Sequence, residues 1–183
     1  MKNLHFVSII TLFSLMSCQE TEKRMHGEPK DDQVSQNEEV SKYPELYEMI
    51  MMKDSLLFQV GFNQIDTGQV SRLISEDFEF YHDVHGVMDS KENFIASING
   101  LSDLSFKTWR ELRDGTVEIF PLYTDNKTQL YGIIQTGKHE FYQQEEGEKA
   151  KRTSIAIFNH LWIKEDGDWK LKRVLSYDHL NTE

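Results

Sequence analysis

The sequence has little of what covalent or metal-linked scaffolds need. Cys18 is the one cysteine among 183 residues, which excludes a disulfide framework and any cysteine-based zinc cluster. The 10 glycines are scattered, so there is no glycine-rich loop of the kind that binds phosphate groups. Basic residues are few: 20 Lys and Arg stand against 31 Asp and Glu, a net charge of −11, which argues against binding to nucleic acid.

Long apolar runs are absent except for one at the N-terminus. Residues 6–16 (FVSIITLFSLM) follow Lys2 and are too short to span roughly 30 Å of hydrocarbon, but they are typical of a secretory signal. The run ends in residues 15–18 (LMSC), which resemble the lipobox of bacterial lipoproteins. The resemblance implies cleavage after residue 17, lipidation of Cys18 and anchoring in a lipid bilayer of the cell envelope, with Gln19 pointing to the outer membrane. The alternative is an ordinary secretory signal with a chance cysteine.

The rest of the chain divides into a tether and one domain. Residues 18–42 contain no aromatic side chain and only three apolar ones, so they cannot bury enough surface to offset the entropy of ordering. We expect a tether without stable structure there, and a folded domain over residues 43–183. At 38% hydrophobic residues, the chain has enough apolar material for one core.

The sequence of the domain predicts helices followed by long strands. Apolar residues at three-to-four-residue spacing predict a helix of about 20 residues after Pro44, a short second helix near residue 70 and a third helix capped by Asp89 or Ser90. Alternation predicts a strand over 77–83 and four longer strands, over 107–120, 129–143, 153–164 and 168–179. Helices first and a meander of strands afterwards are typical of an α+β domain.

This arrangement resembles the nuclear transport factor 2-like superfamily, which includes SnoaL-like polyketide cyclases and ketosteroid isomerases. The segments that carry the resemblance are 54–58 (DSLLF), 62–63 (FN), 78–83 (FEFYHD), 137–142 (GKHEFY), 160–162 (HLW), 168–171 (DWKL) and 173–179 (RVLSYDH). The match is greatest to a subgroup without an assigned function. It implies a cone-shaped fold, with three N-terminal helices packed on a curved antiparallel sheet and a pocket at the wide end.

Polar residues interrupt the apolar faces of the predicted strands. If those faces are concave, seven side chains converge: His82, Arg110, His139, His160, Arg173, Tyr177 and His179. Burying so many polar groups without partners is costly, so they either bond one another or line a wet cavity, and we favour the cavity. Histidine also titrates near neutral pH, which suits proton transfer.

Two other site types are disfavoured. In the segment His82-Asp83-x-His85, the two histidines do not share a face of a strand, and no stronger metal motif is present, so we predict no metal and no cofactor. Alternation also directs Asp83 and Asp178 away from the histidine face. This departs from the isomerase pattern, in which an inward aspartate abstracts the proton.

These observations leave three functions open. We favour binding of a small, partly apolar molecule in a pocket lined by His, Arg and Tyr. One alternative is an enzyme of the cyclase, isomerase or dehydratase type, with histidine as acid or base and Arg110 or Tyr177 stabilising an oxyanion. The other is a homodimeric assembly domain that associates through the outer face of the sheet.

Overall fold

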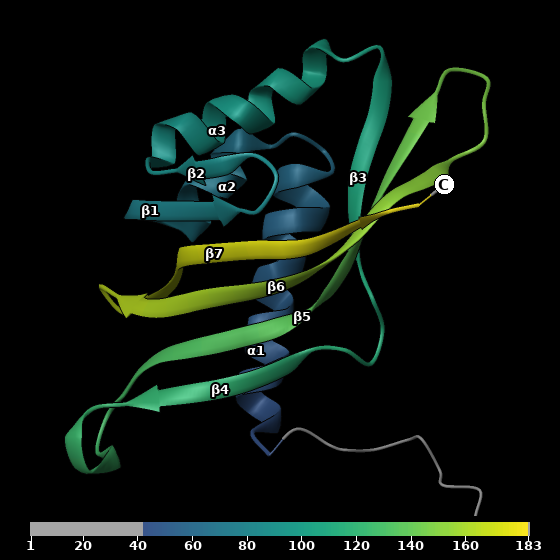
Figure 1. Cartoon of the computed structure of the whole chain (residues 1–183). Coiled ribbons are helices and arrows are strands. Elements are labelled where there is room, and N and C mark those ends of the chain that lie inside the picture. Colours follow the sequence, from purple (N-terminus) through teal and green to yellow (C-terminus); the bar gives the residue numbers. More distant parts are fainter. Residues whose placement is uncertain (1–41, 183) are drawn as a thin grey trace, which may run out of the picture. The chain divides into compact units, whose positions relative to one another are not determined.

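A computed structural model describes residues 42–182 of the chain (Figure 1). The predicted signal peptide, Cys18 and almost all of the predicted tether lie outside the described residues. Within residues 42–182, no helix is long and apolar enough to cross a membrane.

The helices form where the sequence predicts them. Helix α1 (Pro44–Ser55) begins with proline in its first turn and continues without a break as the π-helical segment η1 (Leu56–Phe62). Helix α2 (Thr67–Leu73) is capped by the carboxylate of Asp66, which accepts a hydrogen bond from the Gln69 N–H at 2.8 Å. Helix α3 (Lys91–Asn99) is capped in the same way by Ser90 and runs into a 3-10 turn, η2 (Gly100–Asp103).

Seven strands form one mixed sheet. They are β1 (Ile74–His82), β2 (Gly86–Met88), β3 (Phe106–Leu112), β4 (Glu118–Tyr123), β5 (Leu130–Glu145), β6 (Lys151–Glu165) and β7 (Asp168–Asn181). The strand order is β2-β1-β7-β6-β5-β3, and β4 also pairs with β5. All pairs are antiparallel except β1 with β7, which are parallel, so the sheet is not antiparallel throughout as the resemblance implied.

The predicted strand over 107–120 is two strands in the structure. A turn at Asp114-Gly115, where Gly115 has a φ of +67°, separates β3 from β4. The two strands then pair with different halves of the long β5: β3 with residues 139–145, and β4 with residues 130–136.

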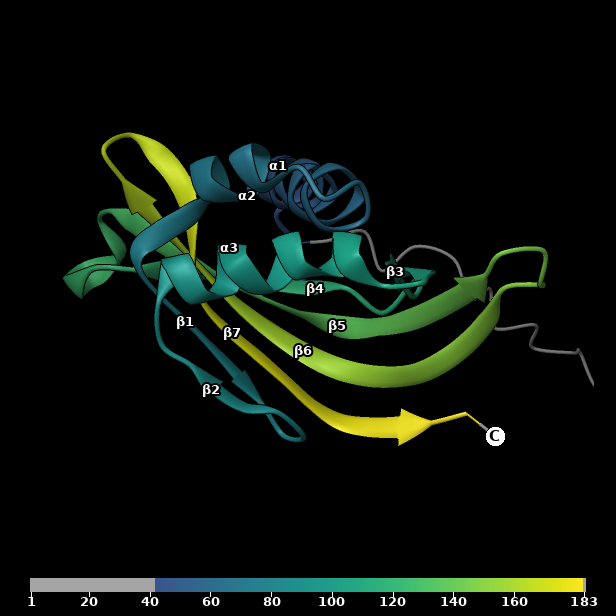
Figure 2. The same ribbon diagram turned by 90° about the horizontal axis from the view of Figure 1, so that it is seen from above.

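The sheet is curved and the helices cover one of its faces (Figure 2). That concave face holds the core, in which the fully buried apolar side chains include Ile50, Leu57, Val70, Phe78, Ile133, Phe158, Trp162 and Leu171. Each contributes about 1.5–3 kcal/mol by leaving water. The α+β fold predicted from the sequence is confirmed.

Two irregularities in β7 decide which of its side chains face the core. Leu161 pairs with Arg173 while the next residue, Trp162, pairs with Leu171, so β7 holds one extra residue there. A second extra residue lies further along, at Asp178, which has a φ of +58°. Each bulge reverses the alternation of the residues that follow it.

Candidate functional site

Six polar side chains are buried together on the concave face. They come from α1, β3, β5, β6 and β7, and they are Asp54, Arg110, Gln135, His139, His160 and Ser176, each 3% exposed or less. Such a density of buried polar groups is tolerated only when the groups bond one another.

The centre of this group is an ion pair between a helix and a strand. Arg110 Nη1 donates to Asp54 Oδ1 at 2.8 Å, and Nη2 reaches Asp54 Oδ2 at 3.4 Å. Gln135 Nε2 donates to the same Oδ2 at 3.1 Å. The guanidinium also lies over the Phe58 ring, 3.7 Å from its centroid, so the charge is enclosed by a carboxylate and an aromatic face.

From Arg110, a chain of hydrogen bonds runs toward the end of β7. Arg110 Nε lies 3.2 Å from His139 Nδ1, His139 Nε2 lies 3.0 Å from Ser176 Oγ, and Ser176 Oγ lies 3.3 Å from His179 Nε2. His179 Nδ1 completes the chain at 2.5 Å from Asp83 Oδ1.

The direction of these bonds follows from Arg110, because a guanidinium can only donate. His139 therefore accepts at Nδ1 and donates from Nε2 to Ser176. The hydroxyl then donates to His179 Nε2, which leaves the proton of His179 on Nδ1, facing the carboxylate of Asp83. Burial and the neighbouring Arg110 charge lower the pKa of His139 to about 2, so this imidazole is neutral at physiological pH.

His160 lies on the other side of the ion pair. Its Nδ1 is 3.1 Å from Gln135 Oε1, which also accepts from Trp162 Nε1 at 2.8 Å, and its ring stacks on Phe58. Burial, with the charge of Arg110, lowers the pKa of His160 well below its usual value. Its Nε2 is the one buried side-chain polar atom of the described residues without a hydrogen-bond partner.

A second histidine cluster lies where β1 ends beside β7. The His82 ring stacks on His179 with centroids 4.1 Å apart, and the His85 ring lies 4.5 Å from His82. His82 Nδ1 accepts from the backbone N–H groups of Val84 and His85, at 3.1 and 3.3 Å. Burial and the two neighbouring imidazoles lower the pKa of His82 to about 4.

Five of the seven side chains predicted to converge share the concave side of the sheet: His82, Arg110, His139, His160 and His179. The prediction is wrong for Arg173 and Tyr177. The first bulge of β7 turns both to the other face, where Arg173 pairs with Glu79 at 2.8 Å and the Tyr177 hydroxyl accepts from Asn159. The second bulge returns His179 to the concave face.

Sequence reasoning missed several members of the group. Asp54 lies four residues after Ile50 and three before Leu57, both fully buried, so a carboxylate on the apolar stripe of the helix was an available signal. Ser176 had no such signal, because only the bulge brings it inward. Asp83 was expected to face away, but it lies in the turn after β1, where strand alternation no longer applies.

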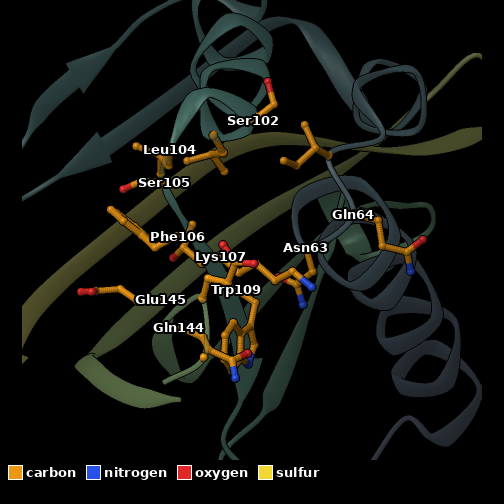
Figure 3. A pocket seen from close by; sticks show the side chains of 15 residues that line it. Asn63, Gln64, Ser102, Leu104, Ser105, Phe106, Lys107, Trp109, Gln144 and Glu145 are labelled. Carbon is orange, nitrogen blue, oxygen red and sulfur yellow. The ribbon is translucent and has the colours of Figure 1, made fainter. Parts of the chain in front are cut away.

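A separate cavity of about 1030 Å³ opens at the free edge of β3 (Figure 3). Its lining comes from the segments before α2, after α3, along β3 and at the end of β5, and includes Asn63, Ile65, Leu104, Phe106 and Trp109. None of the seven predicted site residues lines it.

Asn63 connects the cavity to the buried group. Its side-chain amide accepts from the Arg110 N–H at 2.9 Å and donates to the Arg110 carbonyl at 3.0 Å, as a neighbouring strand would. The position of this cavity-lining side chain is therefore fixed by the residue that forms the central ion pair.

No protein-family model matches the sequence, and no curated protein matches it. Solved structures do. An NTF2-like superfamily protein from Salmonella enterica serovar Typhimurium is 13% identical and superposes with a TM-score of 0.57 over 76% of this chain and 94% of that one. An NTF2-like protein from Cytophaga hutchinsonii is 15% identical, with a TM-score of 0.54 over 71% of this chain and 95% of the other.

A third neighbour is ActVI-ORFA from Streptomyces coelicolor, at 12% identity and a TM-score of 0.57 over 72% of this chain and 95% of that protein. At identities this low, the similarity shows only that the fold is shared. The chain therefore has the nuclear transport factor 2-like fold.

Proposed function

We propose that the domain binds a small, partly apolar molecule in the cavity at the free edge of β3. The observation that carries this proposal is the cavity itself. Its volume of about 1030 Å³ lies just above the usual range for small-molecule sites, roughly 300–1,000 Å³.

The lining supports a ligand with both an apolar body and a hydrogen-bonding group. Ile65, Leu104 and Phe106 supply apolar surface, and Leu104 is 40% exposed. Asn63 and Gln144 supply amide groups, of which Asn63 is held in place by the backbone of Arg110. A few fixed polar groups among apolar ones are what give such sites orientation and specificity.

The first experiment is native mass spectrometry of residues 39–183, which contain all of the described part of the chain, purified gently from the native host. Denaturing release then identifies any retained molecule. A retained small molecule supports the proposal. A domain that is always ligand-free, and that takes up nothing from an extract of host metabolites, contradicts it.

Variants locate the retained molecule. Phe106→Ala removes an apolar wall of the cavity, and losing the burial of one aromatic ring weakens binding by about ten- to a hundredfold. Phe120→Ala is the matched control, because Phe120 is 48% exposed on β4 and is not among the cavity-lining residues. Equal affinities for the two variants would place the ligand elsewhere.

We further propose that the domain is carried on a lipid anchor at Cys18 in the outer membrane. The support is the lipobox-like segment 15–18 and the short apolar run before it. Several acyl chains on one terminus anchor a protein stably. The full chain expressed in its native host should incorporate radiolabelled palmitate and Cys18→Ser should not; an unlabelled full chain, or a labelled Cys18→Ser chain, contradicts the anchor.

A further inference from the structure

We propose that His82, Asp83, His85 and His179 form a binding site for one divalent transition-metal ion, of which zinc is the best match, where the end of β1 meets the end of β7. The proposal concerns none of the cavity-lining residues. Its failure would therefore leave the ligand-binding proposal untouched, and the reverse also holds.

The fold brings three of these groups together from distant parts of the sequence. His82, Asp83 and His179 each offer a donor atom, and the donor atoms all lie within 4.8 Å of one another. Asp83 Oδ1 is the centre of the group, 3.4 Å from His82 Nδ1 and 2.5 Å from His179 Nδ1. From the sequence alone, only His82 and His85 could be compared as metal ligands, because nothing in the sequence shows that the bulge at Asp178 turns His179 toward them.

His85 is placed to act as a fourth ligand. Its ring lies 4.5 Å from that of His82, and it is exposed in the turn that joins β1 to β2. An exposed side chain can change rotamer without disturbing the core, so its imidazole can reach an ion held by the other three groups.

The donor set indicates the class of ion. Imidazole nitrogens with one carboxylate oxygen suit zinc and its neighbours, whereas calcium and magnesium prefer oxygen ligands throughout. Ligand bonds of about 2.0–2.1 Å in a tetrahedral site leave the donor atoms about 3.3 Å apart. The 3.4 Å separation between His82 and Asp83 already fits, and the 2.5 Å separation between Asp83 and His179 opens by under about 1 Å when the metal ion replaces the shared proton.

The surroundings hold these ligands in orientation. Asp83 Oδ2 accepts from the backbone N–H of His179 at 3.2 Å, so the carboxylate is fixed from its other oxygen. Ser176 Oγ lies 3.3 Å from His179 Nε2; when Nδ1 binds a metal, this hydrogen bond reverses, and the Ser176 oxygen accepts the proton that then lies on Nε2. Such outer contacts are typical of metal sites and tune their affinity. At His82, binding exchanges two long hydrogen bonds from the turn for one metal bond.

The test uses residues 39–183, which exclude Cys18 and its thiol. After dialysis against EDTA, the domain is titrated with ZnCl₂ by calorimetry and with CoCl₂ by visible absorption, which reports the coordination geometry. We expect one ion per chain, a dissociation constant below about 10 µM, and a tetrahedral cobalt spectrum. No binding at about 100 µM metal overturns the proposal.

Variants then assign the ligands. His179→Gln and Asp83→Asn should each weaken zinc binding by at least about 100-fold, and His85→Gln by about tenfold. Asp178→Asn is the matched control: it removes a neighbouring exposed carboxylate, asparagine tolerates the φ of +58°, and affinity should not change. If His179→Gln does not fold, the other two variants still test the site. Asp83→Asn is nearly isosteric and His85 is exposed, so both of these variants should fold. Equal loss in Asp178→Asn, or full binding by Asp83→Asn, would show adsorption to surface groups and overturn the assignment.

Discussion

Asp54 on α1 and Arg110 on β3 form an ion pair inside the domain, with a 2.8 Å contact and both side chains only 1% exposed. The pair ties the first helix to the edge of the sheet. Removing two charges from water is costly, so such a pair stabilises a fold only when further hydrogen bonds satisfy both groups. Here Gln135 and His139 supply those bonds, and Asn63 holds the Arg110 backbone.

Asp54→Asn should lower the free energy of unfolding by about 3 kcal/mol, because it leaves the Arg110 guanidinium buried without a counter-charge. Urea denaturation measures the change. Asp103→Asn, at an exposed carboxylate in η2, should change stability by no more than about 0.5 kcal/mol. The double variant Asp54→Leu with Arg110→Met should cost less than Asp54→Asn, since it leaves no unpaired charge. An Asp54→Asn loss below about 1 kcal/mol would contradict this view of the pair.

The elements of the fold were largely predictable because their signals are local. The spacing of Ile50 and Leu57 shows the buried stripe of the first helix, and Ser90 is one of the two caps that the sequence offers for the third. The parallel pairing of β1 with β7 was not predictable, since it joins residues such as His82 and Ser176 that are far apart in the sequence. A single strand was predicted over 107–120, although Gly115 is a turn signal, because the alternating residues on both sides of it look the same whether the chain continues or turns.

The candidate site was predictable only where strands are regular. Alternation along β5 and β6 correctly directs His139 and His160 inward, since neither strand has a bulge between those residues and the buried Ile133 and Trp162. The same rule fails on β7, where each extra residue exchanges the two faces: the first sends Arg173 and Tyr177 outward, and the second returns His179 inward.

Asn63→Asp should disconnect the cavity from the buried group. The change is isosteric, but a carboxylate cannot donate to the Arg110 carbonyl 3.0 Å away and is repelled by it. We expect a loss of about 1–3 kcal/mol in the free energy of unfolding, together with weaker retention of the cavity ligand. Asn126→Asp is the control, because Asn126 is exposed in the turn before β5, is not among the cavity-lining residues and undergoes the same chemical change. If both variants behave alike, the amide of Asn63 does not position β3.

Two glycine-to-alanine changes should act in opposite directions. A Cβ at Gly61 would lie 2.6 Å from Val70 Cγ2, so Gly61→Ala should force η1 and α2 apart and cost about 1–3 kcal/mol. Gly100 has a φ of −62° and open space around it, so Gly100→Ala should stabilise by about 0.4–1 kcal/mol. Thermal unfolding of the two variants side by side checks both signs. If Gly61→Ala stabilises the domain, Val70 on α2 can move away from the added methyl group without cost.

Ile65 lies in the left-handed region, with a φ of +58°, and also lines the cavity. A β-branched residue is strained there, and the strain remains in any residue with a Cβ. Ile65→Ala and Ile65→Gly lose the same packing, but only glycine relieves the strain. The free energy of unfolding of Ile65→Gly should therefore exceed that of Ile65→Ala by about 1 kcal/mol in urea denaturation, which reverses the usual order of glycine and alanine variants. If Ile65→Ala is at least as stable as Ile65→Gly, the backbone at residue 65 can leave the left-handed region at no cost in free energy.

Two buried histidines should make the fold sensitive to acid. Burial, with the charge of Arg110, lowers the pKa of His139 to about 2 and that of His160 well below its usual value, whereas both titrate near 6.5 in the unfolded chain. Between pH 6.5 and 4 the unfolded chain therefore binds more protons than the folded one, and stability falls as pH falls. Above pH 6.5 neither state binds these protons, so the contribution is constant there.

The expected slope is about 1.4 kcal/mol per pH unit for each of the two histidines between pH 6 and 4.5, and His82 adds to it in the same direction. Urea midpoints measured at a series of pH values give this slope. His139→Gln should reduce it by the contribution of one histidine, about 1.4 kcal/mol per pH unit. The variant is expected to be less stable at every pH, but the slope is the informative quantity, because a purely structural loss would shift the curve without changing its steepness. A wild-type curve that stays flat from pH 6.5 to 5 would mean that the imidazoles of His139 and His160 accept protons in the folded domain, and that the buried group has access to water.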